Sequence, residues 1–407
     1  PKTIHSMLNY QYEEWKGGQD RDPKETEKPK DCHGADCFDE KTEILTKDGW
    51  KKFSEIIIGE SLMTHIGEYQ PCSDIVSYNY SGEMIKIDSQ HLDLLVTPNH
   101  RMLVDKKSCN IKLQFEKAGD LKNFYRIPTI PLNYQSHYDG MISLPPVWTE
   151  HGHKWEDERY ISSEVWAQFM GWYISEGSAT GTKGGKIQSP GRGYQVIISQ
   201  SVDNKKKDEI AFLLDKLPWK WHLHGKNNFT ISSKQLWQKV FPLGNSYNKR
   251  IPRDVLNLNV NCLKKLWSSL VKGDGWIKKS TGRQDKEQYA TVSEKLSDDI
   301  QELLLKLGYP SSIYERNPQP WSIAGRSGTN AAKQFYITPR LRNFAVIRNS
   351  EGNKKFNSIL YKGMVYCATV PNHTLVIRRN KKTAVTGNSI RYLCMSNPEF
   401  YLPQIYE

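Results

Sequence analysis

The hydrophobic pattern of this chain changes twice along its length, and that change limits the folds open to it. Residues 42 to 104 contain short apolar runs separated by turn signals such as Asp48-Gly49, a pattern typical of β-strands and hairpins. Further along, four apolar residues recur at the helical spacing i, i+3, i+4 and i+7: Leu263, Leu266, Trp267 and Leu270. From about Lys362 the strand-like runs return. The sequence therefore predicts an all-β module that an α-containing insert divides.

A second helix is predicted later in the insert. Ser297 is placed to cap its N-terminus, and Gly308 follows its C-terminus. Asp298 and Asp299 then fall in the first turn. Three leucines form the apolar stripe of this helix: Leu303, Leu304 and Leu307. Residues 131 to 152, which are rich in Pro and Gly, are predicted to be the linker that leads into the insert.

The positive charge of the chain is confined to its middle. The 407 residues carry a formal net charge of +12, but residues 1 to 36 and 389 to 407 are both slightly acidic. An excess of cations on one internal segment indicates a polyanionic partner, most simply double-stranded DNA. On charge alone, a solvated lysine-rich surface explains the excess equally well. With 37% hydrophobic residues, the chain is long enough for two to three domains, and a disordered or collagen-like chain is excluded.

Cysteines and apolar stretches bear on the compartment. The seven cysteines are odd in number, scattered and without a CxxC pair, which argues against a disulfide scaffold or a zinc knuckle. No apolar stretch reaches the roughly 18 residues that a membrane span needs, and the start lacks the pattern of a signal peptide. We therefore expect a cytoplasmic protein without membrane contact. Because the first residue is Pro1 rather than Met, we interpret the chain as a fragment of a longer protein.

The two ends of the divided module carry residues that can break peptide bonds. Cys37 opens the module, and Asn388 followed by Ser389 closes it. A thiol can attack the carbonyl of its own preceding peptide bond to give a thioester, which a second nucleophile takes over. An Asn side chain can cyclise on its own carbonyl and cut the chain behind it. Together these residues predict a reaction at both seams of the module.

The segments around these residues resemble the splicing blocks of inteins. The segment CFDEKTEILTKDGWKKFSEI resembles the N-terminal block, and LLVTPNHRMLV resembles the block that contains Thr-x-x-His. The segments VYCATVPNHTLVIRRN and TAVTGNS resemble the two C-terminal blocks. The resemblance implies a mainly β Hint splicing domain, horseshoe-like in shape. It also implies autocatalytic splicing that needs no cofactor.

At the N-terminal junction, the resemblance implies roles for three residues. Cys37 would perform an N-to-S acyl shift on the carbonyl of Asp36. Thr97 and His100 would polarise or protonate the scissile amide, because a peptide nitrogen is a poor leaving group until it receives a proton. For His100 alone, a hydrogen-bonded surface imidazole is the alternative, and Thr97 three residues earlier argues against it.

At the C-terminal junction, Ser389 would accept the acyl group and Asn388 would cyclise to release the intein. Cys367 occupies a position that assists branching and cleavage in the family, and His373 is the histidine of the downstream block. Both also fit structural roles. Gly387 departs from the family, which usually has His here. Either His373 takes over as the acid or the C-terminal cut is slow, and a Gly387→His substitution is expected to speed release.

Two segments of the insert resemble the paired LAGLIDADG motifs of homing endonucleases: FMGWYISEG and WSSLVKGDG. The resemblance implies an α+β domain with pseudo-twofold αββαββ halves, whose two helices pack through small residues, Gly171 and Ser269. Glu176 and Asp274, at the helix ends, would then share divalent metal ions, Mg²⁺ or Mn²⁺, over the scissile phosphates. Solvated turns are the alternative for two acids beside glycines.

Further segments of the insert extend this resemblance. NKRIP nominates Lys249 as an active-site base or phosphate contact, and Lys295, in SEKLSDDIQELLLKLG, is a second candidate. The segment YQVIISQ is suited to a strand that lies in the DNA major groove. Ser269, where Gly is common, and Lys272 near the helix interface are departures from the motif, and they leave open a nuclease that has lost catalysis.

The flanks, joined from residue 36 to residue 389, read KPKDCHGAD-SIRYLCMSN and resemble the last acidic motif of a phage terminase large subunit. The resemblance implies that Asp36 is a metal ligand of the host nuclease after splicing, with Asp31 as a weaker candidate. Ile390 and Leu393 would face the nuclease core. Host terminase subunits would then be partners, in the cytoplasm of a phage-infected or lysogenic cell. An unrelated amphipathic tail is the alternative.

These observations predict five segments: a flank over 1–36, half of the splicing domain over 37–140, the endonuclease over 141–350, the other half over 351–388, and a flank over 389–407. We expect a monomer that excises residues 37–388, ligates the flanks and cleaves double-stranded DNA at a specific site. One alternative is a splicing-competent intein whose decayed nuclease only binds DNA. The other is a DNA endonuclease on an inert Hint scaffold.

Overall fold

The computed structural model describes residues 36–106, 111–121, 124–136, 138, 140–149, 153–180, 182–183, 186–187, 194–200, 206–279, 286–323, 326–329, 332–348 and 356–388. The predictions for four residues lie outside the described residues: Asp31, Ser389, Ile390 and Leu393. No helix in the described part is long and apolar enough to cross a membrane.

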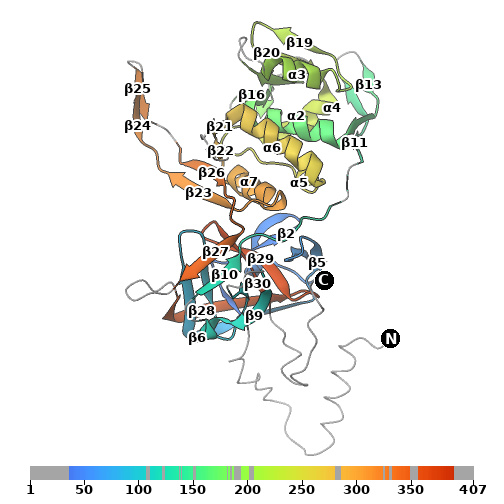
Figure 1. Ribbon diagram of the computed structural model, residues 1–407. Helices are drawn as coiled ribbons and strands as arrows, with labels where there is room; N and C mark the ends of the chain where they lie inside the picture. Colours follow the sequence, from blue (N-terminus) through green and yellow to red (C-terminus); the bar gives the residue numbers. More distant parts are fainter. Residues whose placement is uncertain are drawn as a thin grey trace, which may run out of the picture. The chain divides into compact units, whose positions relative to one another are not determined.

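Strands from the two ends of the described chain pair with each other in a closed barrel. β1 (Phe38–Asp39) pairs antiparallel with β28 (Phe356–Thr369), and β28 pairs along its whole length with β6 (Asp74–Asp88). β7 (Asp93–Val96) pairs with both β6 and β1 and closes the ring. One β unit is therefore built from both ends of the described chain, and its strands lie together in Figure 1.

A second sheet of the β unit has the strand order β30-β29-β2-β4-β5, and β3 pairs with β2. Its strands are β2 (Glu43–Thr46), β3 (Gly49–Lys52), β4 (Ser61–Met63), β5 (Tyr69–Pro71), β29 (Thr374–Arg379) and β30 (Lys382–Gly387). Asn380 and Lys381 connect β29 to β30 and both have positive φ, as a tight two-residue hairpin turn requires. The hairpin delivers Asn388 directly after β30. The turn predicted at Asp48-Gly49 joins β2 to β3.

A third sheet of this unit has the order β27-β10-β8-β9. Its strands are β8 (Arg101–Asp105), β9 (Leu113–Lys117), β10 (Phe124–Pro128) and β27 (Phe344–Arg348). β27 pairs with β10 over five residues, from Phe344 opposite Pro128 to Arg348 opposite Phe124. This strand thus pairs with the β unit, although the boundary expected at residue 350 assigned it to the insert.

The insert consists of two halves with the same order of elements. The first contains α2 (Ser163–Glu176), β15 (Gly177–Ala179), β18 (Gln195–Ser199), α3 (Lys206–Leu214), β19 (Trp221–His224) and β20 (Asn228–Ser232). The second contains α6 (Val260–Asp274), β21 (Gly275–Lys278), β22 (Lys286–Thr291), α7 (Glu294–Lys306), β23 (Ser311–Arg316) and β26 (Gln334–Pro339). The sheet orders β15-β18-β20-β19 and β21-β22-β26-β23 are equivalent, so the halves repeat one another.

Shorter elements complete the described insert. They are β11 (Met141–Leu144), β12 (Val147–Thr149), β13 (Lys154–Glu156), β14 (Arg159–Ser162), β16 (Thr182–Lys183), β17 (Lys186–Ile187), α4 (Lys234–Val240), α5 (Arg253–Leu256), β24 (Pro320–Ile323) and β25 (Arg326–Thr329). The prediction of a linker over residues 131 to 152 is wrong for residues 141–144 and 147–149, which form β11 and β12. The reason is the alternation in β11, which buries Ile142 and Leu144 in a hydrophobic core that the insert shares with residues of the β unit.

The start of α7 differs from the prediction. Ser293, not Ser297, caps this helix, because the Ser293 hydroxyl accepts a hydrogen bond from the Leu296 N–H at 3.2 Å. Ser297 is fully buried inside the helix, where its hydroxyl donates to the Glu294 carbonyl at 2.8 Å. Gly308 has φ +84 just beyond the helix, in agreement with the predicted end.

Ion pairs join α7 to the β29–β30 hairpin. Arg378 of β29 is 1% exposed and forms salt bridges with Glu43 of β2 and Asp298 of α7, both at 2.7 Å. Its guanidinium also lies over the Trp50 ring, 4.7 Å from the centroid. Lys381, in the hairpin turn, adds a second pair with Asp298 at 2.7 Å.

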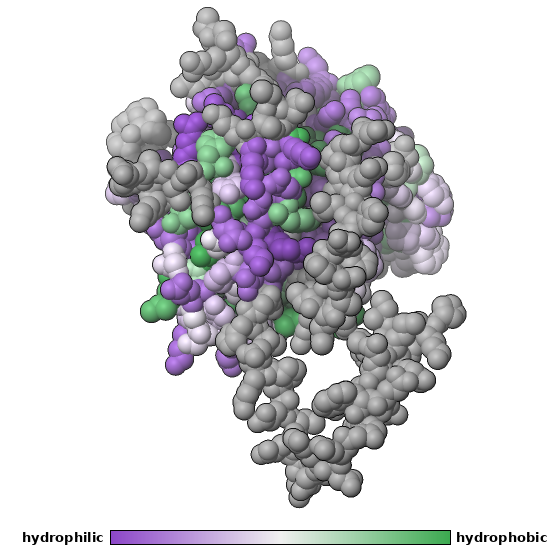
Figure 2. Space-filling model, turned by 60° about the horizontal axis from the view of Figure 1, so that its bottom comes forward, coloured by the Kyte–Doolittle hydropathy of each residue, from purple (hydrophilic) through white to green (hydrophobic). Residues whose placement is uncertain are grey.

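On the face of the molecule that Figure 2 shows, hydrophilic residues predominate among the described residues, and apolar residues are scattered.

Candidate functional site

The peptide bond between Asp36 and Cys37 lies in a buried position at the start of β1. The Cys37 N–H donates a hydrogen bond to Thr97 Oγ1 at 3.0 Å, and the Thr97 N–H donates to the Cys37 carbonyl at 3.1 Å. The Cys37 thiol is fully buried, with Sγ 3.7 Å from the Tyr78 hydroxyl oxygen. The structure therefore holds the nitrogen of this bond against the predicted threonine.

His100 lies beside the same bond. Its ring is fully buried, packs edge-on against Phe38 with centroids 4.5 Å apart, and has Nε2 2.8 Å from Thr386 Oγ1. Burial, followed by the charge of Arg101, lowers the pKa of His100 to about 3, while a backbone interaction with Asp36 acts in the opposite direction. The imidazole is therefore neutral at pH 7. It carries a proton on one ring nitrogen only, so the other nitrogen can accept a proton and pass it on.

The C-terminal junction is equally enclosed. Asn388 is fully buried; its N–H donates to the His373 carbonyl at 3.0 Å and its Nδ2 to the Val370 carbonyl at 3.4 Å. Burial and the charge of Arg101 lower the pKa of His373, whereas a side-chain hydrogen bond with Asn388 opposes that shift. His373 also has φ +59, a left-handed conformation that is uncommon outside glycine. The predicted histidine and the predicted asparagine thus lie in contact.

Arg101, which the sequence reasoning missed, contacts both junctions. Its Nη2 donates to the Asn388 carbonyl oxygen at 2.7 Å, and its Nε lies 3.2 Å from Asp36 Oδ2. Its guanidinium stacks over the Phe115 ring, 5.0 Å from the centroid. Burial raises the pKa of Asp36 to about 6, although Arg101 acts in the opposite direction. Arg101 directly follows His100 in the sequence, and no spacing or residue type marks it as special.

Gly387 has no room for a side chain. A Cβ atom at this position would lie 2.4 Å from the Arg101 carbonyl oxygen and 3.2 Å from Phe115 Cε1. The histidine that is usual here in the resembled family therefore does not fit unless β8 moves. This argues against the expectation that Gly387→His speeds release. Cys367 is buried in β28 opposite Val76, with Sγ 3.7 Å from the Ala368 carbonyl oxygen.

In the insert, α2 and α6 pack through very small residues. A Cβ on Gly171 would lie 2.6 Å from Ser269 Cβ, and a Cβ on Gly273 would lie 2.3 Å from Ser175 Cβ. Each residue meets the one that holds the same place in the other motif, as a twofold relation requires. Larger side chains would separate the two helices, so these positions bring their C-terminal ends together.

Each of these ends carries an acid. Asp274 ends α6, and its pKa is raised to about 6 by burial and then by the negative charge of Glu176, the last residue of α2. The Gln200 side-chain amide donates to Glu176 Oε1 at 3.3 Å. Among the described residues no group of three or more His, Cys, Asp or Glu side chains could hold a metal ion. The acid pair fits a divalent cation that relieves its repulsion and takes its other ligands from water or phosphate.

Lys249 caps the end of α2 from within the fold. Its ammonium group is buried and donates to the carbonyls of Tyr173, Ile174 and Gly177 at 3.0, 2.9 and 2.7 Å. Burial lowers the pKa of Lys249 to about 8, and Asp274 opposes that shift. Three donated hydrogen bonds favour the protonated form, so the structure makes Lys249 a fixed cation beside the acids.

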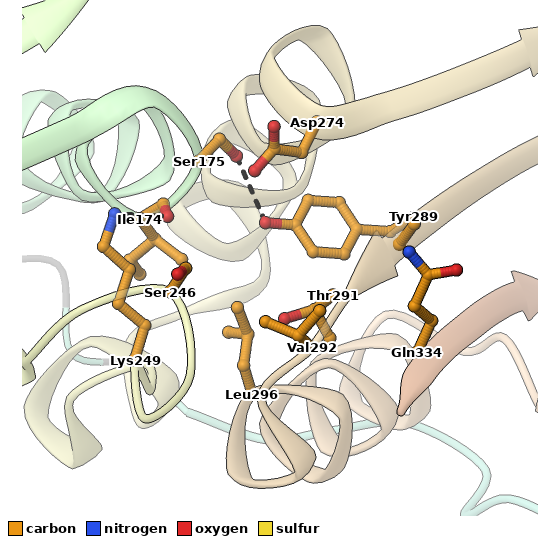
Figure 3. A pocket seen from close by; sticks show the side chains of 11 residues that line it. Ile174, Ser175, Ser246, Lys249, Asp274, Tyr289, Thr291, Val292, Leu296 and Gln334 are labelled. Carbon is orange, nitrogen blue, oxygen red and sulfur yellow. Dashed lines mark hydrogen bonds between the residues drawn. The ribbon is translucent and has the colours of Figure 1, made fainter. Parts of the chain in front are cut away.

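A cavity of about 280 Å³ opens next to Lys249 and Asp274. Tyr289 of β22 lines it, and its hydroxyl lies 3.3 Å from Ser175 Oγ (Figure 3). The same hydroxyl also hydrogen-bonds to Asp274. The sequence reasoning did not identify Tyr289, because an aromatic residue in a strand carries no motif. Lys295 is exposed and does not line the cavity, and Lys272 pairs with Glu209 of α3 at 2.7 Å.

Residues 261–359 match the family model of the LAGLIDADG-like domain. The chain is 28% identical over 294 residues to the ATP-dependent Clp protease proteolytic subunit of Chlamydomonas moewusii, which covers 69% of this chain and 29% of that protein. It is 29% identical over 406 residues to the DNA-directed RNA polymerase subunit beta C-terminal section of Stigeoclonium helveticum, and the match covers 87% of this chain and 36% of that protein. It is 21% identical over 394 residues to the ribonucleoside-diphosphate reductase subunit beta of Aquifex aeolicus, and the match covers 91% of this chain and 53% of that protein.

Two kinds of solved structure are similar to parts of the chain. A variant of I-DmoI in complex with its target DNA and Mn has a TM-score of 0.29 and 16% identity, and covers 44% of this chain and 87% of its own. The gp41-1 intein has a TM-score of 0.19 and 13% identity, and it covers 31% of this chain and 84% of its own. The chain spans about a third of the length of the first two curated relatives that it matches.

Proposed function

We propose that residues 37 to 388 form an intein that excises itself and ligates Asp36 to Ser389, and that its insert cleaves double-stranded DNA. The observation that carries the splicing proposal is the double contact of Arg101. One guanidinium binds the Asp36 side chain at the first seam and the Asn388 carbonyl at the second. Two seams that lie 352 residues apart along the chain therefore converge on one side chain.

The names of the curated relatives support an inserted element. They are those of a protease subunit, an RNA polymerase subunit and a reductase subunit, and this chain corresponds to only a part of each. Proteins with such unrelated names share a segment most simply when that segment has been inserted into each of them.

The first step forms a bond from Cys37 Sγ to the Asp36 carbonyl carbon and breaks the bond from that carbon to the Cys37 nitrogen. The thiol loses a proton and the leaving nitrogen gains one. Neutral His100 is suited to carry this proton, because it is buried beside the bond and uncharged at pH 7. Thr97 orients the nitrogen through the hydrogen bond that it accepts.

The later steps move the chain to Ser389 and release the intein. The Ser389 hydroxyl attacks the thioester and frees the Cys37 thiol. Asn388 Nδ2 then bonds to its own backbone carbonyl carbon, the bond to the Ser389 nitrogen breaks, and the ester between the flanks rearranges to an amide. Arg101 stabilises the negative charge that develops on the Asn388 carbonyl oxygen. His373, which contacts the Asn388 side chain, can exchange the proton that a histidine at position 387 would otherwise handle.

Mass spectrometry of the purified chain after incubation tests splicing. The proposal predicts a 352-residue intein, residues 37–388, and a 55-residue ligated product. Cys37→Ala should block the thioester and the ligation, and Asn388→Ala should leave the intein attached to its C-terminal flank. Persistence of the intact precursor in all three proteins would contradict the proposal.

For the insert, the buried acid pair carries the proposal of DNA cleavage. Glu176 and Asp274 would hold Mg²⁺ or Mn²⁺, which when bound activates water and neutralises charge on phosphate oxygens. Lys249 adds a fixed positive charge beside the acids, and the basic middle of the chain suits a polyanion. The combined Glu176→Gln and Asp274→Asn substitutions should remove DNA cleavage and leave splicing unchanged.

Two results would decide between the proposal and its alternatives. Glu158→Gln, at an exposed acid of the insert, is the matched control and should cleave normally. DNA binding without cleavage by the unsubstituted chain would favour a decayed nuclease. Cleavage without splicing would favour an inert β unit.

The flanks and the cellular setting are part of the same proposal. The joined sequence around Asp36 and Ser389 supports a phage terminase large subunit as the host, with Asp36 as a ligand of its nuclease metal after ligation. The partners are then host terminase subunits in the cytoplasm of an infected or lysogenic cell, and the precursor is a monomer. Light scattering on the Cys37→Ala protein at several concentrations tests the monomer, and a dimer mass would refute it.

A further inference from the structure

Arg101 occupies a position that both junctions need. It is the first residue of β8, and its guanidinium is held in place by the Phe115 ring below it. Two different nitrogens of this group face two different acceptors: Nε faces the Asp36 carboxylate and Nη2 faces the Asn388 carbonyl. The two contacts share one positive charge.

Sharing weakens the effect of this charge on the Asn388 carbonyl. The Asp36 carboxylate is 9% exposed and the Arg101 side chain 23%, so water screens this pair less than a surface ion pair. A guanidinium that is neutralised by a nearby carboxylate withdraws less electron density from a second acceptor. While Asp36 is in place, Arg101 orients Asn388 but activates its carbonyl only partly.

The precursor fixes Asp36 through its bond to Cys37. The Cys37 nitrogen is held by Thr97, and a backbone interaction with Asp36 acts on His100. When the acyl group leaves Cys37, residue 36 is no longer tied to Thr97 through that bond. Its carboxylate then loses its fixed place against Arg101.

We propose that Arg101 sets the order of the two cuts. The attached Asp36 carboxylate restrains Arg101 until the first junction has reacted, and the released guanidinium then activates the Asn388 carbonyl. This inference rests on the proposed splicing function. The step itself is balanced: Asn388 Nδ2 bonds to the Asn388 carbonyl carbon, the bond to Ser389 breaks, and a proton moves from Nδ2 to the leaving amine.

The test uses a Cys37→Ala chain, in which the first junction cannot react and Asp36 stays attached. Mass spectrometry measures the rate at which residues 389–407 are released. Replacing the carboxylate, by Asp36→Asn or Asp36→Ala, should speed this premature release about tenfold, which corresponds to about 1.4 kcal/mol in the barrier. In an Arg101→Met chain the release should be slow whichever residue occupies position 36. Arg101→Lys should restore part of the dependence of the release rate on the carboxylate at position 36.

A control variant and a stability measurement make the result decisive. Arg348→Met removes an exposed charge from β27, a strand of the same sheet that does not pair with β8, and should leave the rates unchanged. Thermal unfolding of each protein identifies a variant that has lost its fold, and the Asp36 variants lie before the first strand. Equal release rates with and without the Asp36 carboxylate, or an acceleration that persists in Arg101→Met, overturn the inference. Absence of cleavage at both junctions in the unsubstituted chain overturns the splicing proposal instead.

Discussion

A Cβ atom on Gly387 would lie 2.4 Å from the backbone carbonyl oxygen of Arg101. The end of β30 therefore runs directly against the start of β8, and this close approach lets Arg101 reach the Asn388 carbonyl at 2.7 Å. The same close approach of the two backbones leaves no room for a side chain at position 387 and places the Arg101 guanidinium against the Asn388 carbonyl. A side chain at 387 would have to displace the group that holds the C-terminal junction.

The first prediction concerns this contact. Gly387→Ala should slow C-terminal cleavage and lower stability by about 1–3 kcal/mol, because overpacking forces β8 and β30 apart. Gly387→His should be at least as damaging. Rates of release of residues 389–407 and urea unfolding curves measure the two effects. Gly140→Ala, at an exposed glycine without positive φ whose added Cβ would meet only the Tyr138 ring at 3.8 Å, controls for the loss of a glycine. Faster release in Gly387→His would show that the histidine is accommodated.

The second prediction concerns His373. Because it contacts the Asn388 side chain, His373→Ala should slow Asn cyclisation by roughly 100-fold, the usual contribution of a positioned acid or base. The first junction should still react, so the thioester or branched stage accumulates and hydroxylamine releases the N-terminal flank from it. His222→Ala, at an exposed histidine of the insert, should splice normally. Equal accumulation of the ligated product in both variants would remove His373 from the mechanism.

Sequence patterns predicted the elements better than their contacts. The acid-Gly endings of the two motifs identified the ends of α2 and α6, because a helix motif and its packing residues lie within one short segment. The cap of α7 was misplaced from Ser293 to Ser297, since both serines precede acids and only tertiary packing decides between them. Arg101 was missed because its partners lie 65 and 287 residues away in the sequence.

The third prediction concerns pH and the acid pair. Burial and Glu176 raise the pKa of Asp274 from 3.8 to about 6, so the folded chain binds a proton more tightly than the unfolded chain. Stability from this group is present at low pH and is lost as the pH rises from about 4 through 6. A bound cation competes with that proton, so Mg²⁺ should raise the melting temperature at pH 7.5 and have little effect at pH 5.

Asp274→Asn provides the control for this pH dependence. Asp36 and Asp299 also have raised pKa values, about 6 and about 7, and titrate in the same range. The contribution of Asp274 is therefore the difference between the melting curves of the two proteins. Asp274→Asn should abolish the Mg²⁺ effect and flatten the dependence between pH 4 and 6. An identical Mg²⁺ shift in both proteins would place the cation elsewhere.

The last prediction concerns the contact between the insert and the hairpin that leads to Asn388. Arg378 is buried between Glu43 and Asp298, and the positive charge lowers the pKa of Asp298. Arg378→Met should lower the free energy of unfolding by about 3 kcal/mol, because it leaves carboxylates without their partner. Lys382→Met breaks an exposed pair with Asp88 and should cost less than about 1 kcal/mol. Since β29 and β30 carry Asn388 into its pocket, Arg378→Met should also slow C-terminal cleavage more than N-terminal cleavage. A loss of stability with an unchanged ratio of the two cleavage rates would show that α7 supports the fold but not the junction.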